Sequence, residues 1–376
     1  MRIVCAPDSF KHSMSALTAA LAMAAGVRRV QPNARCDIMP MADGGEGTTQ
    51  AIVDAVGGQL VRVDVRDALG RPQRARYGIV PTKLAVIEVA QAAGLELIAP
   101  DERDPLAAST YGVGQMIRDA LNRGARRLIV GLGGSATNDG GAGLLAALGA
   151  RLLGIDGRPL PPGGGPLLDL MDIDLTGLDA RLASRQIDLA CDVDNPLLGP
   201  QGASAVFGPQ KGASPAQVEL LDRALTRFAD VLEAAAGRRV RDLPGAGAAG
   251  GLGVPLLALT DARIRPGVEI VAEAVGLAAR VAGADYVFTG EGSLDAQTLR
   301  GKTPLGVLRV AEAAGVPVVM FGGRVDDVAR RALRGRVIAL MPVTPPGVDL
   351  DDALRRAPEF LADAAELAAS MLVGTS

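Results

Sequence analysis

Short apolar runs alternate with stretches of helical periodicity at both ends of the chain. The runs predict β-strands at 2–6, 36–40, 284–289, 316–321 and 336–341. Apolar residues spaced for one face of a helix predict α-helices at 15–29, 46–56, 303–314, 325–333 and 353–372. Strands that alternate with helices in this way are typical of a parallel sheet covered by helices on both faces.

The two ends of the chain complete one another. Neither end supplies enough strands for a sheet, whereas together they supply about five, which is a usual sheet size. We therefore predict an α/β protein of two domains, in which residues 1–65 and 283–376 build a doubly wound parallel-sheet domain. Residues 66–282 would form a second α/β domain inserted into the first, because they carry their own strand-like runs, such as 126–130 and 187–191.

The composition agrees with helix-on-sheet layers and adds loops shaped for a ligand. Hydrophobic residues make up 48% of the chain but aromatic residues only 2%, so the core is built from Ala, Val, Leu and Ile. The 48 glycines gather in short runs beside acidic and hydroxyl residues. Such runs let the backbone approach a bound molecule closely.

The charge pattern excludes several classes of function. The 39 basic and 42 acidic residues give a net charge of −3 without a long run of one sign, so we expect no nucleic-acid partner. No apolar stretch reaches the roughly 18 residues of a membrane span. The run at 16–27 resembles a signal-peptide core, but the strand before it and Pro7 favour a cytoplasmic protein. His12 is the only histidine, which excludes a His-based triad or a multi-His metal site.

Two motifs near the N-terminus follow predicted strands directly. The first strand leads into APDSFKHS, which places Asp8, Ser9 and Lys11 where open α/β sheets bind their ligands. The second leads into MADGGEGT, which places Asp43 and Glu46 around a glycine pair at the start of a helix. Each motif has a plainer alternative: a serine cap beside a solvated lysine, or acidic residues that cap a helix instead of binding Mg²⁺.

A glycine-rich segment in the middle of the chain has the context of a phosphate-binding loop. The strand RRLIV leads into GLGGSATNDGGAG, which then opens a helix. Gly133 and Gly134 allow close approach of a ligand, and successive N–H groups can cradle a phosphate. The side chains of Ser135, Thr137 and Asn138 add polar groups to the loop. The alternative is a simple tight turn.

Carboxylates and an amide follow another apolar strand, in ACDVDNPLLG. Asp192, Asp194 and Asn195 together suit an Mg²⁺ site or a base beside a substrate hydroxyl. The alternative is an Asx-type turn before Pro196. Farther along, GPQKGAS contains Lys211, which would contact phosphate or remain a surface lysine.

Two further glycine motifs approach known patterns without matching them. The strand ADYVF leads into TGEGSLDAQTLRGKT, where Glu291 and Asp295 are candidates for metal or substrate binding. Its end nearly spells a Walker A loop, but Ala296 stands at the first glycine position, so we reject a standard P-loop. The run PGAGAAGGLG contains G-x-G-x-x-G, but Pro244 precedes it instead of a Rossmann strand.

Combined, these loops supply the glycine N–H groups, carboxylates, amide and lysines that phosphoryl transfer needs. In the same order and over almost the whole chain, the motifs resemble those of the bacterial class I glycerate kinases. The resemblance rests on APDSFK, ADGGEGT, DALGRP, STYGVG, GLGGSATNDGGAG, CDVDNPLLG, FGPQKGA, GAGAAGGLG and TGEGSLDAQTLRGK. It implies ATP-dependent phosphorylation of D-glycerate to 2-phosphoglycerate, and a discontinuous α/β domain with a second α/β domain inserted.

We assign each candidate residue a role in that reaction. Asp192 is the first choice for the base that orients the glycerate hydroxyl, with Asp43 as the runner-up. Lys11 would neutralise the transferring phosphoryl group or the substrate carboxylate. The candidates for Mg²⁺ are Asp194, Glu291 and Asp295. Those for ATP are Gly133, Gly134, Ser135, Thr137, Asn138 and Lys211, and those for glycerate are Asp8, Ser9, Asn195 and Arg324.

Two other functions stay open on the sequence. An NAD(P)-dependent dehydrogenase of a small hydroxy acid would use the G-x-G-x-x-G segment, but this segment lacks a preceding strand. A non-catalytic two-domain small-molecule binding protein would not need so many acidic glycine loops. The sequence is compatible with a homo-oligomer and does not fix the oligomeric state.

Overall fold

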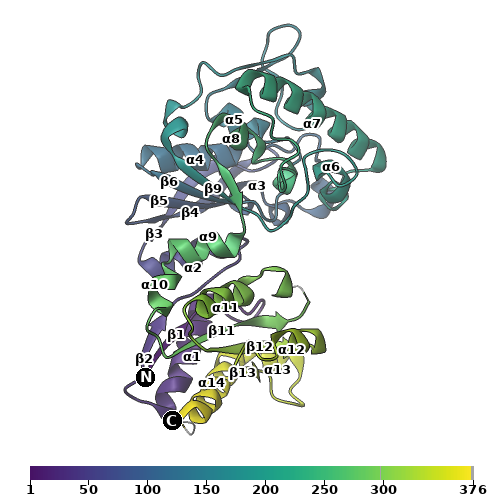
Figure 1. The fold of residues 1–376 in the computed structure, drawn as a ribbon. Helices are drawn as coiled ribbons and strands as arrows, with labels where there is room; N and C mark the ends of the chain where they lie inside the picture. Colours follow the sequence, from purple (N-terminus) through teal and green to yellow (C-terminus); the bar gives the residue numbers. More distant parts are fainter. Residues whose placement is uncertain (297, 374–376) are drawn as a thin grey trace. The chain divides into compact units, whose positions relative to one another are not determined.

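The computed structural model describes residues 1–296 and 298–373, and it separates the chain into two compact units (Figure 1). The terminal unit consists of Met1–Asp43, Gln50–Gly57 and the described residues from Val268 onward. The inserted unit consists of Gly44–Thr49 and Gly58–Gly267. Across the described residues, no helix combines the length and the hydrophobicity that a bilayer crossing requires.

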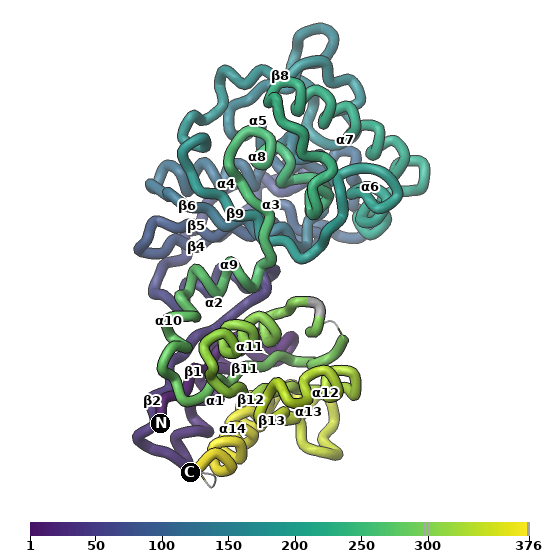
Figure 2. Tube along the Cα trace, viewed as in Figure 1, coloured from purple at the N-terminus to yellow at the C-terminus, as the bar shows by residue number. Residues whose placement is uncertain are grey.

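The terminal unit is built on a parallel sheet to which both ends of the chain contribute. Its strand order is β13-β12-β11-β1-β2, and every neighbouring pair is parallel. The purple start of the chain therefore lies beside green β11 in Figure 2. The strands are β1 (Arg2–Cys5), β2 (Arg35–Ile38), β11 (Tyr286–Leu294), β12 (Val318–Val325) and β13 (Ala339–Pro342). The predicted doubly wound sheet is confirmed.

Two long helices share one face of this sheet. Helix α1 (Ala16–Val30) packs along α14 (Ala357–Val373), and both form a core with Phe288 and Phe321 of the sheet. Gly26 allows this close packing, because a Cβ atom there would lie 2.1 Å from the carbonyl oxygen of Ala362. The other helices are α2 (Thr48–Val56, whose first two residues belong to the inserted unit), α9 (Gly267–Ala274), α10 (Leu277–Val281), α11 (Thr303–Ala313), α12 (Asp327–Leu333) and α13 (Leu350–Arg355).

The inserted unit has a mixed sheet with the order β10-β9-β6-β5-β4-β3. The pairs β3–β4 and β4–β5 are antiparallel, whereas β5, β6, β9 and β10 run parallel. Its strands are β3 (Gln59–Arg66), β4 (Pro72–Val80), β5 (Leu84–Glu88), β6 (Arg127–Gly131), β9 (Gln186–Ala190) and β10 (Arg263–Arg265). Strands β7 (Arg151–Leu153) and β8 (Asp172–Asp174) form a separate antiparallel sheet.

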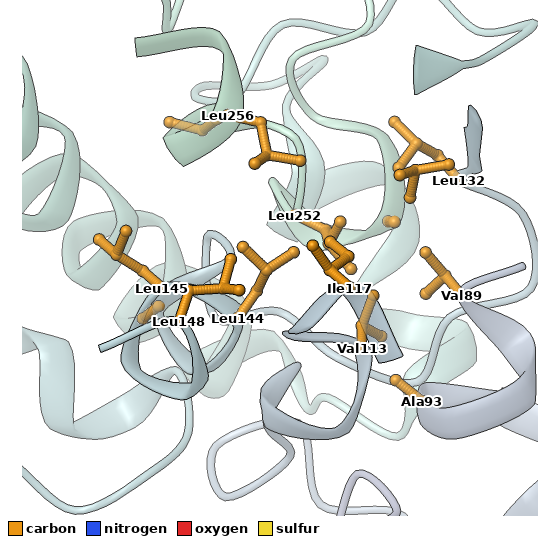
Figure 3. Close-up of a cluster of buried hydrophobic side chains, with 14 of the residues drawn as sticks. Val89, Ala93, Val113, Ile117, Leu132, Leu144, Leu145, Leu148, Leu252 and Leu256 are labelled. Atoms are coloured by element: carbon orange, nitrogen blue, oxygen red, sulfur yellow. The ribbon is translucent and has the colours of Figure 1, made fainter. Parts of the chain in front are cut away.

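Helices of the inserted unit bury an aliphatic core, part of which appears in Figure 3. Val113 and Ile117 of α4 lie near Leu144 of α5 and Leu252 in that view. Gly114 permits the contact between the two helices, since a Cβ atom there would lie 2.5 Å from the carbonyl oxygen of Leu144. The helices are α3 (Ala90–Ala93), α4 (Tyr111–Asn122), α5 (Ala142–Ala147), α6 (Ala203–Phe207), α7 (Pro215–Ala236) and α8 (Val254–Leu259).

The boundaries of the two units differ from those expected at 65/66 and 282/283. Strand β3 belongs to the inserted unit because all of its residues pair with β4. Helices α9 and α10 belong to the terminal unit apart from Gly267. Such differences arise because the local pattern of a strand does not reveal its partner. The expected helix at 353–372 is in fact two helices, α13 and α14, separated by Arg356.

Candidate active site

The strand order of the terminal unit reverses between β1 and β11. Open α/β sheets bind ligands beyond the carboxyl ends of the strands at such a reversal, because the connections there leave in opposite directions. Asp8 follows β1, and its backbone N–H donates to the carbonyl oxygen of Gly290 in β11 at 2.9 Å. Glu291 is the next residue of β11. Two carboxylates therefore lie at the switch point.

Asp8 is held by hydrogen bonds on both carboxylate oxygens. Oδ1 accepts from the backbone N–H of Ser9 at 2.6 Å, and Oδ2 accepts from the hydroxyl of Thr303 at the start of α11. Burial and the nearby Asp43 nevertheless raise the pKa of Asp8 to about 6. The carboxyl group of Asp8 is therefore poised to exchange a proton near neutral pH.

Glu291 is the second carboxylate with an altered affinity for protons. Its Oε1 accepts from the hydroxyl of Thr298 at 2.6 Å, and its Oε2 lies 3.8 Å from Nζ of Lys302. Burial, with smaller contributions from Asp8 and Asp295, raises the pKa of Glu291 to about 7, although Thr298 and Lys302 oppose the shift. In the terminal unit, Asp8, Asp43, Glu291 and Asp295 thus form one cluster of interacting charges. Ser9 is linked to it by its hydrogen bond to Asp8.

The raised pKa of Asp8 makes a prediction about stability. An unfolded Asp has a pKa of about 3.9. The folded protein holds this proton more tightly, so the contribution of Asp8 to stability falls as pH rises from about 4 to 6 and stays low above that. Asp8→Asn should therefore raise Tm at pH 7.5 and increase the free energy of unfolding by about 1–3 kcal/mol. The gain should vanish near pH 4.

Thermal unfolding at several pH values checks this prediction. Asp194→Asn is the matched control, because Asp194 is exposed and the same substitution there replaces a carboxylate that is not buried. A destabilised Asp8→Asn protein at pH 7.5, or a difference that does not change between pH 4 and 8, would show that Asp8 is not strained by burial.

Lys11 and Arg324 are the two basic candidates of the terminal unit. Lys11 is exposed, in the turn that follows Asp8, next to His12 with a φ of 63°. Arg324 is exposed in β12, opposite Ser293 of β11. Both side chains are accessible to a ligand.

The sequence reasoning missed Thr298, Lys302 and Thr303, which contact the two buried carboxylates. The signal was present in the GKT triplet at the end of the rejected Walker A pattern. Rejecting the pattern was consistent with the fold, since a short 3₁₀ turn (Thr298–Arg300) precedes α11 there. The basic and hydroxyl residues of the triplet still lie at the switch point. Gln297, in the same motif, is outside the described residues.

The glycine-rich loop of the inserted unit leaves the carboxyl end of β6. Gly133 and Gly134 are exposed, and Gly134 has a left-handed φ of 67°. Ser135, Thr137 and Asn138, which the sequence assigns to ATP, are buried. The side-chain amide of Asn138 donates to the hydroxyl of Ser204 at 2.9 Å.

Lys211 lies beneath the same loop. Its ammonium group donates to Oγ of Ser135 at 3.0 Å and to the carbonyl oxygen of Thr137 at 2.6 Å. Burial lowers the pKa of Lys211 to about 7, and only the charge of Asp139 opposes this. The amino group of Lys211 therefore lies inside the loop and bonds to its residues, and is not on the loop's surface.

The second glycine run packs against this loop and explains the G-x-G-x-x-G spacing. A Cβ atom on Gly250 would lie 2.1 Å from the carbonyl oxygen of Thr137, and one on Gly251 would lie 3.0 Å from Cα of Gly140. The run contains a 3₁₀ turn (Ala248–Gly250) in place of the strand–turn–helix of a dinucleotide site. The glycines serve backbone packing, so the fold gives no support to the dehydrogenase alternative.

The carboxylates after β9 are exposed. Asp192 accepts from the backbone N–H of Gly267 at 3.0 Å, and Asn195 donates its side-chain amide to the carbonyl oxygen of Gln201 at 2.8 Å. Asp194 is exposed in the same loop. Asp192 and Asp194 belong to the inserted unit, whereas Glu291 and Asp295 belong to the terminal unit.

The comparisons with known proteins decide the family. The model of the glycerate kinase family matches residues 3–373. The chain belongs to the glycerate kinase family. Glycerate kinase of Bacillus subtilis (strain 168) is 48% identical over 373 residues, covering 99% of this chain and 98% of the relative. Glycerate 2-kinase of Escherichia coli (strain K12) is 43% identical over 376 residues, covering 100% and 99%.

A solved structure agrees with this assignment. A crystal structure assigned as glycerate kinase 2 from Salmonella typhimurium LT2 matches with a TM-score of 0.92 and 46% identity. The match covers 100% of this chain and 99% of that chain. The family prediction is confirmed, and with it the enzyme class: a kinase that phosphorylates glycerate. The roles of single residues in this glycerate kinase stay predictions.

The carboxylates around Glu291 suit a cation that prefers oxygen ligands and takes only a few of them from the protein. In the described part of the chain, no group of three or more His, Cys, Asp or Glu residues has the arrangement of a metal site. The buried carboxylate of Glu291 nevertheless lies in the electric field of Asp8 and Asp295, and such excess negative charge attracts a divalent cation. Mg²⁺ in kinases is usually bound by one or two carboxylates together with phosphates and water.

Proposed function

We propose that this glycerate kinase family member transfers the γ-phosphoryl group of ATP to the 2-hydroxyl of D-glycerate, giving ADP and 2-phosphoglycerate. The observation that carries the proposal is the cluster of Asp8, Glu291 and Lys302 at the switch point of the terminal sheet. It combines carboxylates near their titration point with a cation, and a hydroxyl acceptor needs both. The E. coli relative is named a glycerate 2-kinase, which supports the 2-hydroxyl as acceptor.

Asp8 is the base in this proposal. A hydroxyl nucleophile loses its proton late, so a carboxylate must orient it and accept the proton as the phosphoryl group arrives. A pKa of about 6 makes Asp8 a stronger base than an ordinary aspartate, while leaving it mostly ionised at pH 7.5. Asp43, the second candidate for the base from the sequence, contributes by raising the pKa of Asp8. Asp192, the first choice from the sequence, is exposed and accepts from Gly267.

The remaining residues divide into anion-binding and cation-binding groups. Glu291 and Asp295 would hold Mg²⁺, which when bound neutralises charge on the phosphates of ATP. In the inserted unit, the backbone N–H groups of Gly133 and Gly134 would donate to phosphate, and buried Lys211 would support their loop. Lys302 and Lys11 supply positive charge for the transferring group. The residues that would recognise glycerate are Ser9, Asn195 and Arg324, with Asp194 as a further candidate for the cation.

A coupled assay of ADP release tests the reaction. Purified protein should release ADP only when D-glycerate and Mg²⁺ are both present, because phosphoryl transfer needs an acceptor and charge neutralisation. EDTA should abolish the signal, excess Mg²⁺ should restore it, and no NAD should be reduced under any of these conditions. ADP release that is equal without glycerate, or indifferent to EDTA, would contradict the proposal.

A further inference from the structure

Glu88, which ends β5, is a buried carboxylate that none of the motifs contains. Its exposed fraction is 5%, and Oε1 accepts from the backbone N–H of Thr49 at 2.7 Å. Thr49 is the second residue of α2, whose first N–H groups have no partner within the helix. The hydroxyl of Thr49 donates to the carbonyl oxygen of Val86 in the same strand, at 3.4 Å. The beginning of α2 is therefore tied to the end of β5.

The segment before α2 lies across the carboxyl ends of three other strands. A Cβ atom on Gly44 would lie 2.7 Å from Cα of Gly267, after β10, and 3.0 Å from Cβ of Ala190 in β9. One on Gly131, which ends β6, would lie 2.6 Å from the carbonyl oxygen of Gly44. Gly45 continues this course, since a Cβ atom on Gly133 would be 3.7 Å from its Cα. Glycine is needed at positions 44 and 131, because the backbone of this segment touches the backbone at the strand ends.

Glycines alone do not fix such a segment, since they leave its backbone free to adopt many conformations. Glu88 holds the far end of the segment, because its carboxylate accepts from the backbone N–H of Thr49. Residue 88 pairs directly with Gly131 in the neighbouring strand. One contact thus connects the helix start, the end of β5 and the strand that opens the glycine-rich loop.

We propose that Glu88 is a positioning residue, whose hydrogen bond to the start of α2 fixes the segment Gly44–Thr48 across the ends of β6, β9 and β10. The segment begins directly after Asp43, whose charge acts on Asp8. Releasing the anchor loosens the chain directly after Asp43 and impairs the phosphoryl-transfer step without removing a group that touches the substrate. The kinetic part of this inference rests on the proposed function.

Two substitutions separate positioning from a direct chemical role. Glu88→Gln keeps an oxygen that can accept from Thr49, whereas Glu88→Ala removes it. We expect kcat of Glu88→Ala to fall by about 10- to 100-fold with little change in KM for ATP, because small displacements of reacting groups are costly. Glu88→Gln should stay within about threefold of wild type, because a neutral acceptor replaces the charged one.

Ser214→Ala is the matched control for loss of a helix cap. Ser214 caps α7 in a capping box with Gln217 and lies outside the proposed machinery. This variant should lower Tm by an amount similar to that for Glu88→Ala and leave kcat unchanged. If Glu88→Ala also leaves kcat unchanged, Glu88 is a structural cap only and the inference fails. If Glu88→Gln is as inactive as Glu88→Ala, the charge itself is required, and positioning is again wrong.

Hydrogen exchange gives a readout that does not depend on activity. The amide of Thr49 should exchange slowly in wild type and in Glu88→Gln, and at least about tenfold faster in Glu88→Ala, because its acceptor is gone. This result does not depend on kinase activity. If the wild-type protein failed to release ADP but showed this exchange pattern, the proposed function would be wrong and the anchor would still hold. Equal protection in all three proteins would overturn the anchor.

Discussion

Asp8→Asn should lower kcat by about 10²- to 10³-fold, because a neutral amide orients the glycerate hydroxyl but cannot accept its proton. The amide fits the space of the carboxylate and can still bond to Ser9 and Thr303, so the fold should be kept. KM for ATP should change little, since the effect falls on the chemical step. Steady-state kinetics at pH 7.5, with circular dichroism as a check on folding, measures these quantities.

The same assay on Asp192→Asn separates the two candidate bases. Asp192 is exposed, and an amide oxygen can still accept from the N–H of Gly267. We therefore expect its kcat to stay within about tenfold of wild type, as for loss of a peripheral charge. The opposite ranking, with Asp192→Asn inactive and Asp8→Asn active, would return the base to Asp192. Near-normal kcat for both, and for Asp43→Asn, would leave no carboxylate base in this enzyme.

Gly250→Ala should cause a large loss of stability, about 2–5 kcal/mol, since left-handed strain and overpacking combine. Gly250 has a φ of +71°, and the added Cβ would lie 2.1 Å from the carbonyl oxygen of Thr137. A backbone atom cannot move aside as a side chain can. The same carbonyl accepts from Lys211, so the variant should also disturb the glycine-rich loop.

Gly124→Ala is the control for backbone conformation alone. Gly124 has a φ of +83°, and a Cβ atom there would meet nothing within 4 Å. It should cost about 1–2 kcal/mol, the usual strain of an alanine in a left-handed conformation. Urea unfolding of both variants gives the comparison. Equal losses would mean that the contact between the two glycine runs is looser than the distances indicate.

Loops at strand ends could be found from the sequence because each one follows an apolar run directly. Asp8 and Glu291 were identified in this way, and the sheet then places them side by side. The bond between Asp8 and Thr303 could not be found, because it joins residues 295 positions apart. Their contact depends on β1 and β11 being neighbours, and no local pattern specifies that.

Buried polar residues were the hardest to interpret. Lys211 looked like a surface or phosphate lysine, yet it is 2% exposed and bonds to the loop from below. Glu88 ends an apolar strand and has no glycine or acidic neighbour to mark it. Its partner Thr49 lies 39 positions away. Residue type and spacing indicate which groups can do chemistry, whereas their roles as supports emerge only from packing.

Nuclear magnetic resonance of the product tests the central claim most directly. D-Glycerate, ATP and Mg²⁺ are incubated with the protein, and the coupling between phosphorus and carbon-bound protons is recorded. We predict a phosphoester coupled to the single proton on carbon 2, formed in amounts equal to ADP. A phosphoester coupled to the protons on carbon 3 would contradict the assigned product, and the absence of any glycerate phosphoester would contradict the proposed reaction itself.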